Sequence, residues 1–301
     1  ARDLRLDRIV AIKELLHETP STRARFQREI AVTVKLQHPN IVAIHEAGQW
    51  PSGQLFYAMN FIIGNTLQQA IANANSLDER LGFVGNVIAI ADALGFAHDH
   101  GVIHRDLKPA NVLVGRFGET VVIDWGLARY TERANVDQEQ TGERPAFAEP
   151  GVTVDGGVVG TPPYMPPEQA RGETASKRAD VYSLGAILYQ ALSGLEPYAE
   201  SRGADILQQI MTRPPVPLAD LEPDVAPDLL AIVDKAMARD PEQRYPDAEA
   251  MAEELRRFTA QVCDGVSRRS FLKIGGLALR RKYRIATLCP SSCTTIRRSA
   301  S

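Results

Sequence analysis

One eight-residue segment constrains this chain more than any other feature. Residues 104–111 read H-R-D-L-K-P-A-N, between a long apolar segment that predicts a buried helix and two β-branched runs that predict a hairpin. From one tight loop ahead of a strand, Asp106, Lys108 and Asn111 can all face a single point. They supply a carboxylate that accepts a hydroxyl proton, a cation that balances phosphate charge and an amide oxygen for Mg²⁺. The segment therefore predicts phosphoryl-transfer chemistry.

The segment resembles the catalytic loop of protein kinases, H-R-D-L-x-x-x-N, and three other motifs follow the order of that family. Residues 10–13 read V-A-I-K, residues 124–126 read D-W-G in place of D-F-G, and residues 160–168 resemble the segment that ends in A-P-E, with Pro166 replacing Ala. Each motif alone is more often structural. Together they resemble a eukaryotic-like, bacterial Ser/Thr protein kinase, with Lys108 and Thr161 favouring Ser/Thr over Tyr.

The resemblance implies a site for ATP and Mg²⁺. Asp106 would accept the proton of the acceptor hydroxyl, and Lys13, paired with Glu29 sixteen residues later, would hold the α- and β-phosphates. Asn111 and Asp124 would supply oxygen ligands to Mg²⁺. The implied catalytic residues are Asp106, Lys108, Asn111 and Lys13; the implied nucleotide-binding residues are Ala11, Lys13, Glu29, Met59 as gatekeeper, Asn60, Ile62, Leu113 and Asp124.

Four other side chains are implied to support this site. Thr161 would bond to Asp106 and Lys108. Asp180, on a helix, would anchor the catalytic loop from below, and Glu168 would pair with a buried Arg244. Asp180, Glu168 and Arg244 are interpreted as structural, because buried charges persist only when they are paired.

The resemblance predicts an α+β, two-lobed protein-kinase fold. Residues 1–63 form a small, incomplete β-rich N-lobe, residues 64–258 a larger helical C-lobe with a hinge near Gly64, and residues 259–301 a basic, non-globular tail. The expected N-lobe elements are strands 9–12, 41–45 and 55–62 and a helix over 22–36. Helices are expected over 77–99, 179–193, 203–212, 227–238 and 247–258, with a polar loop over 130–158.

The sequence begins twelve residues before Lys13, which leaves no room for the glycine-rich loop of kinases. We therefore expect a fragment that lacks the first strand and that loop, with weak activity or none of its own. Two alternatives stay open. One is a catalytically silent, kinase-like binding module; the other is a small-molecule kinase, which would lack the substrate platform at residues 160–168.

Charge and cysteine placement bear on partners and location. Residues 264–301 hold nine Lys/Arg and one Asp, which leaves 25 basic against 36 acidic residues elsewhere. An acidic body argues against nucleic-acid binding. The resemblance to protein kinases implies protein substrates with Ser or Thr acceptors as partners. All three cysteines lie at or beyond residue 263, which fits a cytoplasmic catalytic domain. The sequence shows no run of about 18 apolar residues, so no segment of it is expected to span a membrane. The basic tail nevertheless predicts a parent protein that is anchored in the inner membrane beyond this tail.

The loop ahead of Thr161 suggests a regulatory site. Arg105 places a cation beside the implied catalytic Asp106, and an arginine there can pair with a phosphate. The candidate acceptors in the loop are Thr131, Thr141 and Thr153. The alternative is a solvated linker in which these threonines are incidental.

Overall fold

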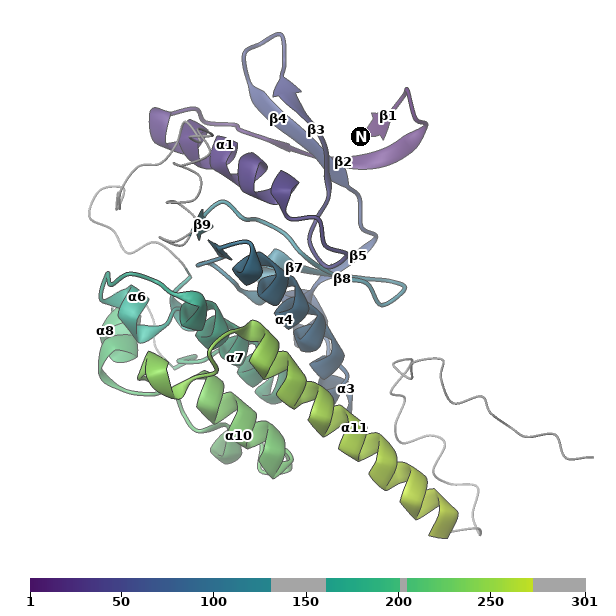
Figure 1. Ribbon diagram of the computed structural model, residues 1–301, viewed down its shortest axis with the longest axis vertical. Coiled ribbons are helices and arrows are strands. Elements are labelled where there is room, and N and C mark those ends of the chain that lie inside the picture. The colour runs from purple at the N-terminus through teal and green to yellow at the C-terminus, as the bar shows by residue number, and fades with distance from the viewer. Residues whose placement is uncertain (131–160, 201–204, 273–301) are drawn as a thin grey trace, which may run out of the picture. The chain divides into compact units, whose positions relative to one another are not determined.

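Figure 1 shows the computed structural model of the protein, which describes residues 1–130, 161–200 and 205–272. The chain divides into two compact units, residues 1–260 and 261–301. The first unit contains the strands, the hydrophobic core and nearly all of the helices, and it combines a small sheet-rich lobe with a helical lobe. This confirms the predicted α+β class and two-lobed fold.

The small lobe is built on an antiparallel four-stranded sheet in the order β1-β2-β4-β3, with α1 beside it (Figure 1). In the pairing of β2 with β4, Ala11 lies opposite Met59 and Lys13 opposite Tyr57. Cross-strand partners project to the same face of a sheet, so Lys13 and Tyr57 share a face. The elements are β1 (Arg2–Asp3), β2 (Arg8–Glu14), α1 (Pro20–Lys35), β3 (Ile44–Gln49) and β4 (Leu55–Asn60).

Helix α1 begins at a capping box, in which the side chains of Thr19 and Thr22 each accept from the other residue's backbone N–H. Its buried residues are Phe26, Glu29, Val32 and Thr33. Their spacing of three or four residues places them on one helical face. The helix thus brings a carboxylate, Glu29, onto the same face as its apolar packing residues.

The helical lobe packs around α4 and α7, in which most residues are buried. Short strands form the sheet β5-β7-β8 and the pair β6-β9. The elements are β5 (Gly64–Thr66), α2 (Leu67–Ala72), α3 (Leu77–Leu81), α4 (Val84–Asp99), β6 (Val102–Ile103), β7 (Val112–Gly115), β8 (Thr120–Val122), β9 (Arg129–Tyr130), α6 (Pro167–Ala170), α7 (Lys177–Ser193), α8 (Asp205–Thr212), α9 (Leu218–Leu221), α10 (Pro227–Ala236) and α11 (Ala248–Leu272).

Two sequence expectations are wrong in detail. The strand expected over 41–45 lies at 44–49, because Ile41 instead makes an isolated parallel bridge to Val122. The single helix expected over 77–99 is two, since the backbone N–H groups of Gly82 and Phe83 bond to Glu79 and Arg80 and close α3 before α4 begins. The lobe boundary proposed at residue 64 stays a prediction; β5 begins there and pairs with β7 of the helical lobe.

The expectation that no segment is apolar and long enough to span a membrane is wrong for residues 77–99. By length and composition this stretch could cross a membrane, although 56% of its apolar 18-residue segment is buried inside the protein. The core helix of a folded domain meets the same criterion. Its burial here accounts for its apolar composition.

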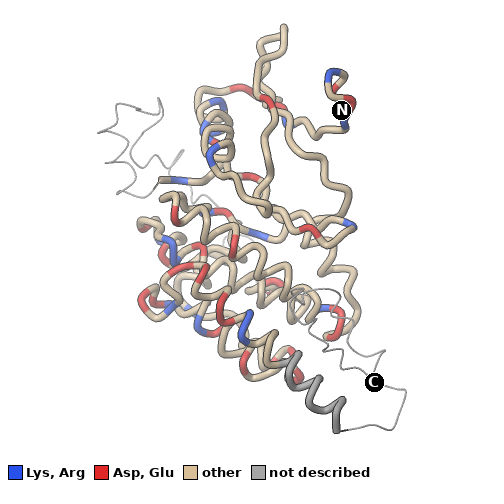
Figure 2. The backbone as a smooth tube through the Cα atoms, turned by 45° about the vertical axis from the view of Figure 1, so that its right-hand side comes forward, with Lys and Arg blue, Asp and Glu red and all other residues tan. Residues whose placement is uncertain are grey.

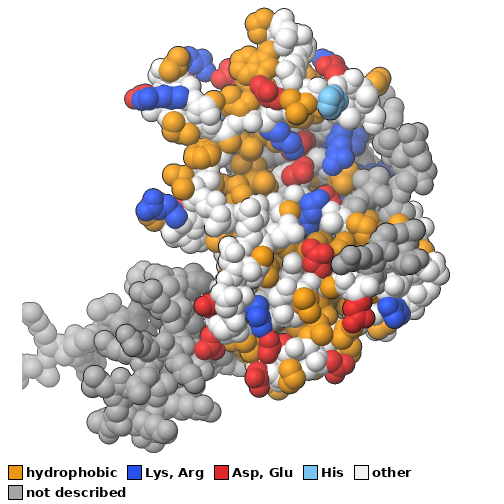
Figure 3. All heavy atoms as spheres, turned by 180° about the vertical axis from the view of Figure 1, so that it is seen from behind, with side chains coloured by type: hydrophobic (Ala, Val, Ile, Leu, Met, Phe, Trp, Pro, Cys, Tyr) orange, Lys and Arg blue, Asp and Glu red, His pale blue; other side chains and the backbone are white. Residues whose placement is uncertain are grey.

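The surface of the described residues carries both signs of charge. Figure 2 shows acidic and basic positions interspersed over the helical lobe and basic positions along α1. On the face seen in Figure 3, hydrophobic side chains gather over the sheet-rich lobe. The large apolar side chains exposed in that lobe and at the lobe junction include Leu4, Ile9, Leu16, Phe61 and Ile63.

Candidate active site

The backbone of the catalytic loop is held by a carboxylate from α7. Asp180, which is fully buried, accepts from the N–H of His104 at 2.8 Å and from the N–H of Arg105 at 2.9 Å. Arg105 has φ +70°, a conformation that non-glycine residues rarely adopt. These bonds, and a third from the Gln169 side chain to the Arg105 carbonyl at 2.9 Å, fix the strained turn. The predicted contact of Asp180 with the loop is confirmed.

Asp180 stays ionised in this position because of its partners. Burial alone would raise the pKa of this carboxyl, but the hydrogen bond from His98 at 2.9 Å and the backbone N–H of Arg105 hold the pKa below its usual value. A carboxylate that accepts several hydrogen bonds favours its charged form. His98 belongs to α4, so one buried pair joins the two central helices to the catalytic loop.

Asp106, Lys108 and Thr161 form a closed triangle of hydrogen bonds. The Lys108 ammonium donates to Asp106 Oδ2 at 3.0 Å and to Thr161 Oγ1 at 2.7 Å, and the Thr161 hydroxyl donates to Asp106 Oδ1 at 3.0 Å. Thr161 follows the loop by fifty residues, so this contact is tertiary. The predicted bonds of Thr161 are confirmed, and they fix both oxygens of the Asp106 carboxylate.

Asn111 lies directly beside this triangle. Its amide nitrogen donates to the Asp106 carbonyl at 3.0 Å, and its own backbone carbonyl accepts from the Ile123 N–H at 2.8 Å. The side chain is thereby oriented through its nitrogen. The amide oxygen is the group available to a cation.

Asp124 comes two residues after β8, with φ +64°. Its Oδ1 lies 3.4 Å from Lys13 Nζ and 3.4 Å from the Gly126 N–H. Burial alone would raise the pKa of this carboxyl, but the Lys13 charge and the Gly126 bond hold it below its usual value. Asp124 is therefore an ionised oxygen donor within reach of Lys13.

Gly126 makes the close approach of these groups possible. A Cβ at this position would lie 3.1 Å from Asp124 Oδ1 and 3.3 Å from Glu29 Oε2. Both distances are tighter than ordinary van der Waals contact. Glycine thus allows the helix carboxylate and the loop carboxylate to approach the same turn.

Lys13 and Glu29 form the predicted ion pair. Lys13 Nζ lies 2.6 Å from Glu29 Oε1, and Glu29 is buried while Lys13 is half-buried. The same oxygen of Glu29 also accepts from the hydroxyl of Tyr57 at 2.7 Å. Tyr57 was not among the predicted site residues, because its contact depends on the β2–β4 register rather than on a local motif.

Trp125 replaces the smaller aromatic residue usual in this motif and is fully buried. Its ring lies 4.7 Å from that of His104, centroid to centroid, at 54°. The first residue of the catalytic loop and the residue after Asp124 therefore pack directly on each other. This contact couples the two loops that carry the polar groups.

The residues implied for the adenine pocket lie in both lobes. Ala11 and Met59 are opposed on neighbouring strands, and Asn60 is the exposed last residue of β4. Ile62 lies in the segment between β4 and β5, and Leu113 lies on β7 in the second sheet. The structure brings Ala11 and Met59 together and places Leu113 in the opposite lobe. Their role in binding a base stays a prediction.

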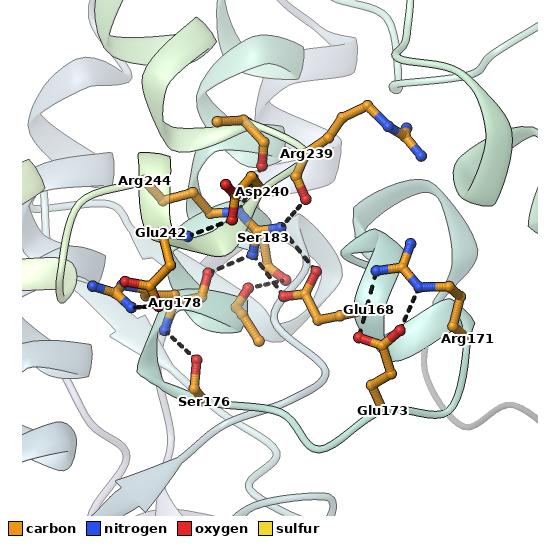
Figure 4. Close-up of polar contacts among 12 residues, drawn as sticks. Glu168, Arg171, Glu173, Ser176, Arg178, Ser183, Arg239, Asp240, Glu242 and Arg244 are labelled. Atoms are coloured by element: carbon orange, nitrogen blue, oxygen red, sulfur yellow. Dashed lines mark hydrogen bonds and ion pairs between the residues drawn. The ribbon is translucent and has the colours of Figure 1, made fainter.

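The segment that follows Thr161, part of the predicted substrate platform, is held by a buried, bidentate ion pair (Figure 4). Arg244 donates to both oxygens of Glu168 at 2.7 and 2.8 Å, and also to the backbone carbonyls of Ala238 and Arg178. The predicted pairing of Glu168 with Arg244 is confirmed. Because the guanidinium bonds to several segments at once, it fixes the chain that follows Thr161 against α7.

Charges of both signs act on Arg105. Burial and the charge of Arg129 lower the pKa of its guanidinium, the charge of Asp180 raises it, and the charge of Arg28 lowers it. The threonines predicted as phosphate acceptors, Thr131, Thr141 and Thr153, lie outside the described residues.

These donors fit nucleotide-bound Mg²⁺. Asn111 and Asp124 offer an amide oxygen and an ionised carboxylate, and Lys13 offers a cation. No group of three His, Cys, Asp or Glu side chains able to hold a metal occurs among residues 1–130, 161–200 and 205–272. Mg²⁺ does not require one, since one or two protein ligands and substrate phosphates commonly hold it.

Comparison with known proteins gives consistent results. The family model described as "Protein kinase domain" matches residues 1–255. "Serine/threonine-protein kinase PknB" of Mycolicibacterium smegmatis is 40% identical over 266 residues, which cover 85% of this chain and 40% of that protein. The PknB of Mycobacterium tuberculosis H37Rv is 38% identical with the same coverage, and "Serine/threonine-protein kinase pkn3" of Myxococcus xanthus is 37% identical over 85% of this chain and 46% of its own length. The chain thus spans less than half the length of these relatives.

Proposed function

The chain belongs to the protein kinase family, and from that premise we propose that it transfers the γ-phosphate of ATP to Ser and Thr hydroxyls of protein substrates. The observation that carries the proposal is the triangle of Asp106, Lys108 and Thr161, with Asn111 and Asp124 beside it. The names of the bacterial relatives support Ser and Thr as acceptors.

Asp106 is the proposed proton acceptor. Its two oxygens are fixed by Thr161 and Lys108, so the carboxylate is oriented before an acceptor hydroxyl arrives. As the bond between the acceptor oxygen and phosphorus forms and the bond from phosphorus to the departing ADP oxygen breaks, the hydroxyl proton passes to Asp106. Lys108 places a positive charge beside the group being transferred. Phosphoryl transfer depends mainly on such positioning and charge stabilisation.

ATP would supply the phosphoryl group, and Mg²⁺ would supply positive charge that offsets the charge of the phosphates. Asn111 and Asp124 are the proposed Mg²⁺ ligands, and Lys13, held by Glu29, is the proposed contact to the α- and β-phosphates. The proposed contacts to the base are Ala11, Met59, Asn60, Ile62 and Leu113.

The organisation of the full-length protein is also a proposal. Residues 1–63 and 64–258 are proposed as the two lobes of a catalytic domain on the cytoplasmic side of the membrane. The basic residues of 259–301 would precede an inner-membrane anchor, since basic segments favour the anionic leaflet. Residues 273–301 lie outside the part that the structure describes.

Peptides that differ only in the acceptor residue test this function. The full-length protein with Mg·ATP is expected to label the Ser and Thr peptides and to leave the Tyr peptide at background. The measurement is transfer of labelled γ-phosphate, with chelation of Mg²⁺ as a control. If neither the Ser peptide nor the Thr peptide is labelled, the proposal is contradicted.

Thr161 is expected to contribute through its hydroxyl. Thr161→Ala removes the group that donates to Asp106 and accepts from Lys108, so we expect peptide phosphorylation to fall about tenfold, the size expected for a hydrogen bond to a charged group. Thr161→Ser is the matched control, because it keeps the hydroxyl, and it should retain most activity. Equal losses in both variants would show that the methyl group matters and the hydroxyl does not.

A further inference from the structure

Tyr57 contributes a second donor to the ion pair of Lys13 and Glu29. Its hydroxyl lies 2.7 Å from Glu29 Oε1, the same oxygen that lies 2.6 Å from Lys13 Nζ. Lys13 and Tyr57 are direct cross-strand partners on β2 and β4. The sheet therefore presents two adjacent donors to one carboxylate oxygen of α1.

Tyr57 contacts α1 a second time through its ring. The ring of Phe26 lies 5.3 Å from that of Tyr57, centroid to centroid, at 39°. Phe26 and Glu29 are three residues apart, which places them on the same face of the helix. All three side chains are buried, at 4% relative exposure or less. Tyr57 thus joins α1 to the sheet by an apolar contact and by a polar one.

Lys13 is more exposed than Tyr57 and has a second anionic neighbour besides Glu29. The Lys13 ammonium also lies 3.4 Å from Asp124, and its side chain is 37% exposed. In a kinase this lysine has to serve nucleotide phosphates as well. Burial, and then the charge of Glu29, raise the pKa of Tyr57, so its hydroxyl keeps its proton and remains a donor at neutral pH.

We propose that Tyr57 is a positioning residue whose hydroxyl holds the Glu29 carboxylate and keeps α1 docked on the sheet independently of Lys13. This rests on the proposed function, because docked α1 matters for catalysis only if the Lys13–Glu29 pair serves phosphoryl transfer. The residue supplies no proton or ligand to the reacting atoms. It raises the fraction of molecules in which Glu29 already faces Lys13.

Amide hydrogen exchange of α1 tests the docking directly and requires no activity. Tyr57→Phe keeps the ring beside Phe26 and removes only the hydroxyl. We expect exchange of the amides in the second half of α1 to rise about tenfold, the factor expected when a buried bond to a charged group is lost, while α4 and α7 keep their protection. Tyr189→Phe is the matched control, since Tyr189 is equally buried and its hydroxyl donates to the Val216 carbonyl at 2.9 Å.

Kinetics give a second readout in the full-length protein. If undocked α1 still allows nucleotide binding but not turnover, Tyr57→Phe should lower kcat for peptide phosphorylation about tenfold and leave KM for Mg·ATP within about twofold. Tyr189→Phe should leave both constants unchanged. These rates are normalised to the folded fraction measured for each variant, because a loss of global stability alone would also lower the apparent kcat without changing KM.

Combination with Glu29→Ala decides whether the hydroxyl acts through Glu29. In that background the acceptor is gone, so Tyr57→Phe should add nothing to α1 exchange; in a Lys13→Met background it should still increase exchange. Unchanged α1 exchange in Tyr57→Phe, or a further increase on top of Glu29→Ala, would overturn the proposal, as would exchange raised equally in every helix. A full-length protein without kinase activity would contradict the proposed function, whereas the exchange results alone decide the role of Tyr57.

Discussion

Replacing Asp106 by Asn is expected to lower peptide phosphorylation by the full-length protein on the order of 10²-fold or more, the loss typical of a positioned acid–base group. The amide has nearly the shape of the carboxylate but lacks its charge and its basicity. Asp106 now accepts from Thr161 at 3.0 Å and from Lys108 at 3.0 Å. An amide oxygen can still accept from Lys108 while the amide nitrogen faces the Thr161 hydroxyl, so the loop should keep its conformation.

Nucleotide affinity separates this loss from misfolding. The Asp106 side chain makes no hydrogen bond or ion pair with Lys13, Asn111 or Asp124, the groups proposed to hold the phosphates and the metal, and Asn111 bonds only to the Asp106 backbone carbonyl. Mg·ATP affinity should therefore hardly change in Asp106→Asn. Asp92→Asn is a suitable control, because Asp92 pairs with Arg256 on the surface of the helical lobe. Near-normal turnover in Asp106→Asn would remove Asp106 from its proposed role.

The short-range features of this site could be predicted from sequence because each is carried by a local motif. The catalytic loop, the strand ending at Lys13 and the turn at Asp124 all occupy contiguous residues with specific spacing. The resemblance then supplied partners far apart in the chain, and the bonds of Asp180, Thr161 and Arg244 confirm them.

The missed features depend on tertiary structure. Tyr57 reaches Glu29 only because β2 and β4 pair with Lys13 opposite Tyr57, a register that neither strand specifies alone. The sequence around His98 shows only a polar residue near the end of an apolar helix. Its role depends on Asp180, which α7 places within hydrogen-bond distance of it. The break between α3 and α4 was missed for the opposite reason. Gly82, the C-cap of α3, marks the helix end, but the apolar residues Leu81 and Phe83 beside it continue the helical pattern and conceal the break.

The largest effect on binding is expected at Asp124. Its carboxylate is ionised, since Lys13 and the Gly126 N–H hold its pKa below the usual value against the effect of burial. A hard cation prefers a charged oxygen ligand, and Asn111 offers only a neutral one. We therefore expect Asp124→Ala to abolish Mg²⁺-dependent nucleotide binding and Asn111→Ala to weaken it. Calorimetric titration with Mg·ATP is the measurement.

Backbone strain has to be separated from the loss of the ligand. Asp124 has φ +64°, which Asn tolerates better than Ala, so Asp124→Asn keeps the local conformation and removes only the charge. If the charge carries the effect, Asp124→Asn should lose Mg²⁺-dependent binding nearly as fully as Asp124→Ala. In excess chelator, wild type and both variants should bind nucleotide alike, because the difference between them depends on the metal. Unchanged Mg·ATP affinity in Asp124→Ala would contradict the assigned metal site and favour a kinase-like binding module that does not use Asp124.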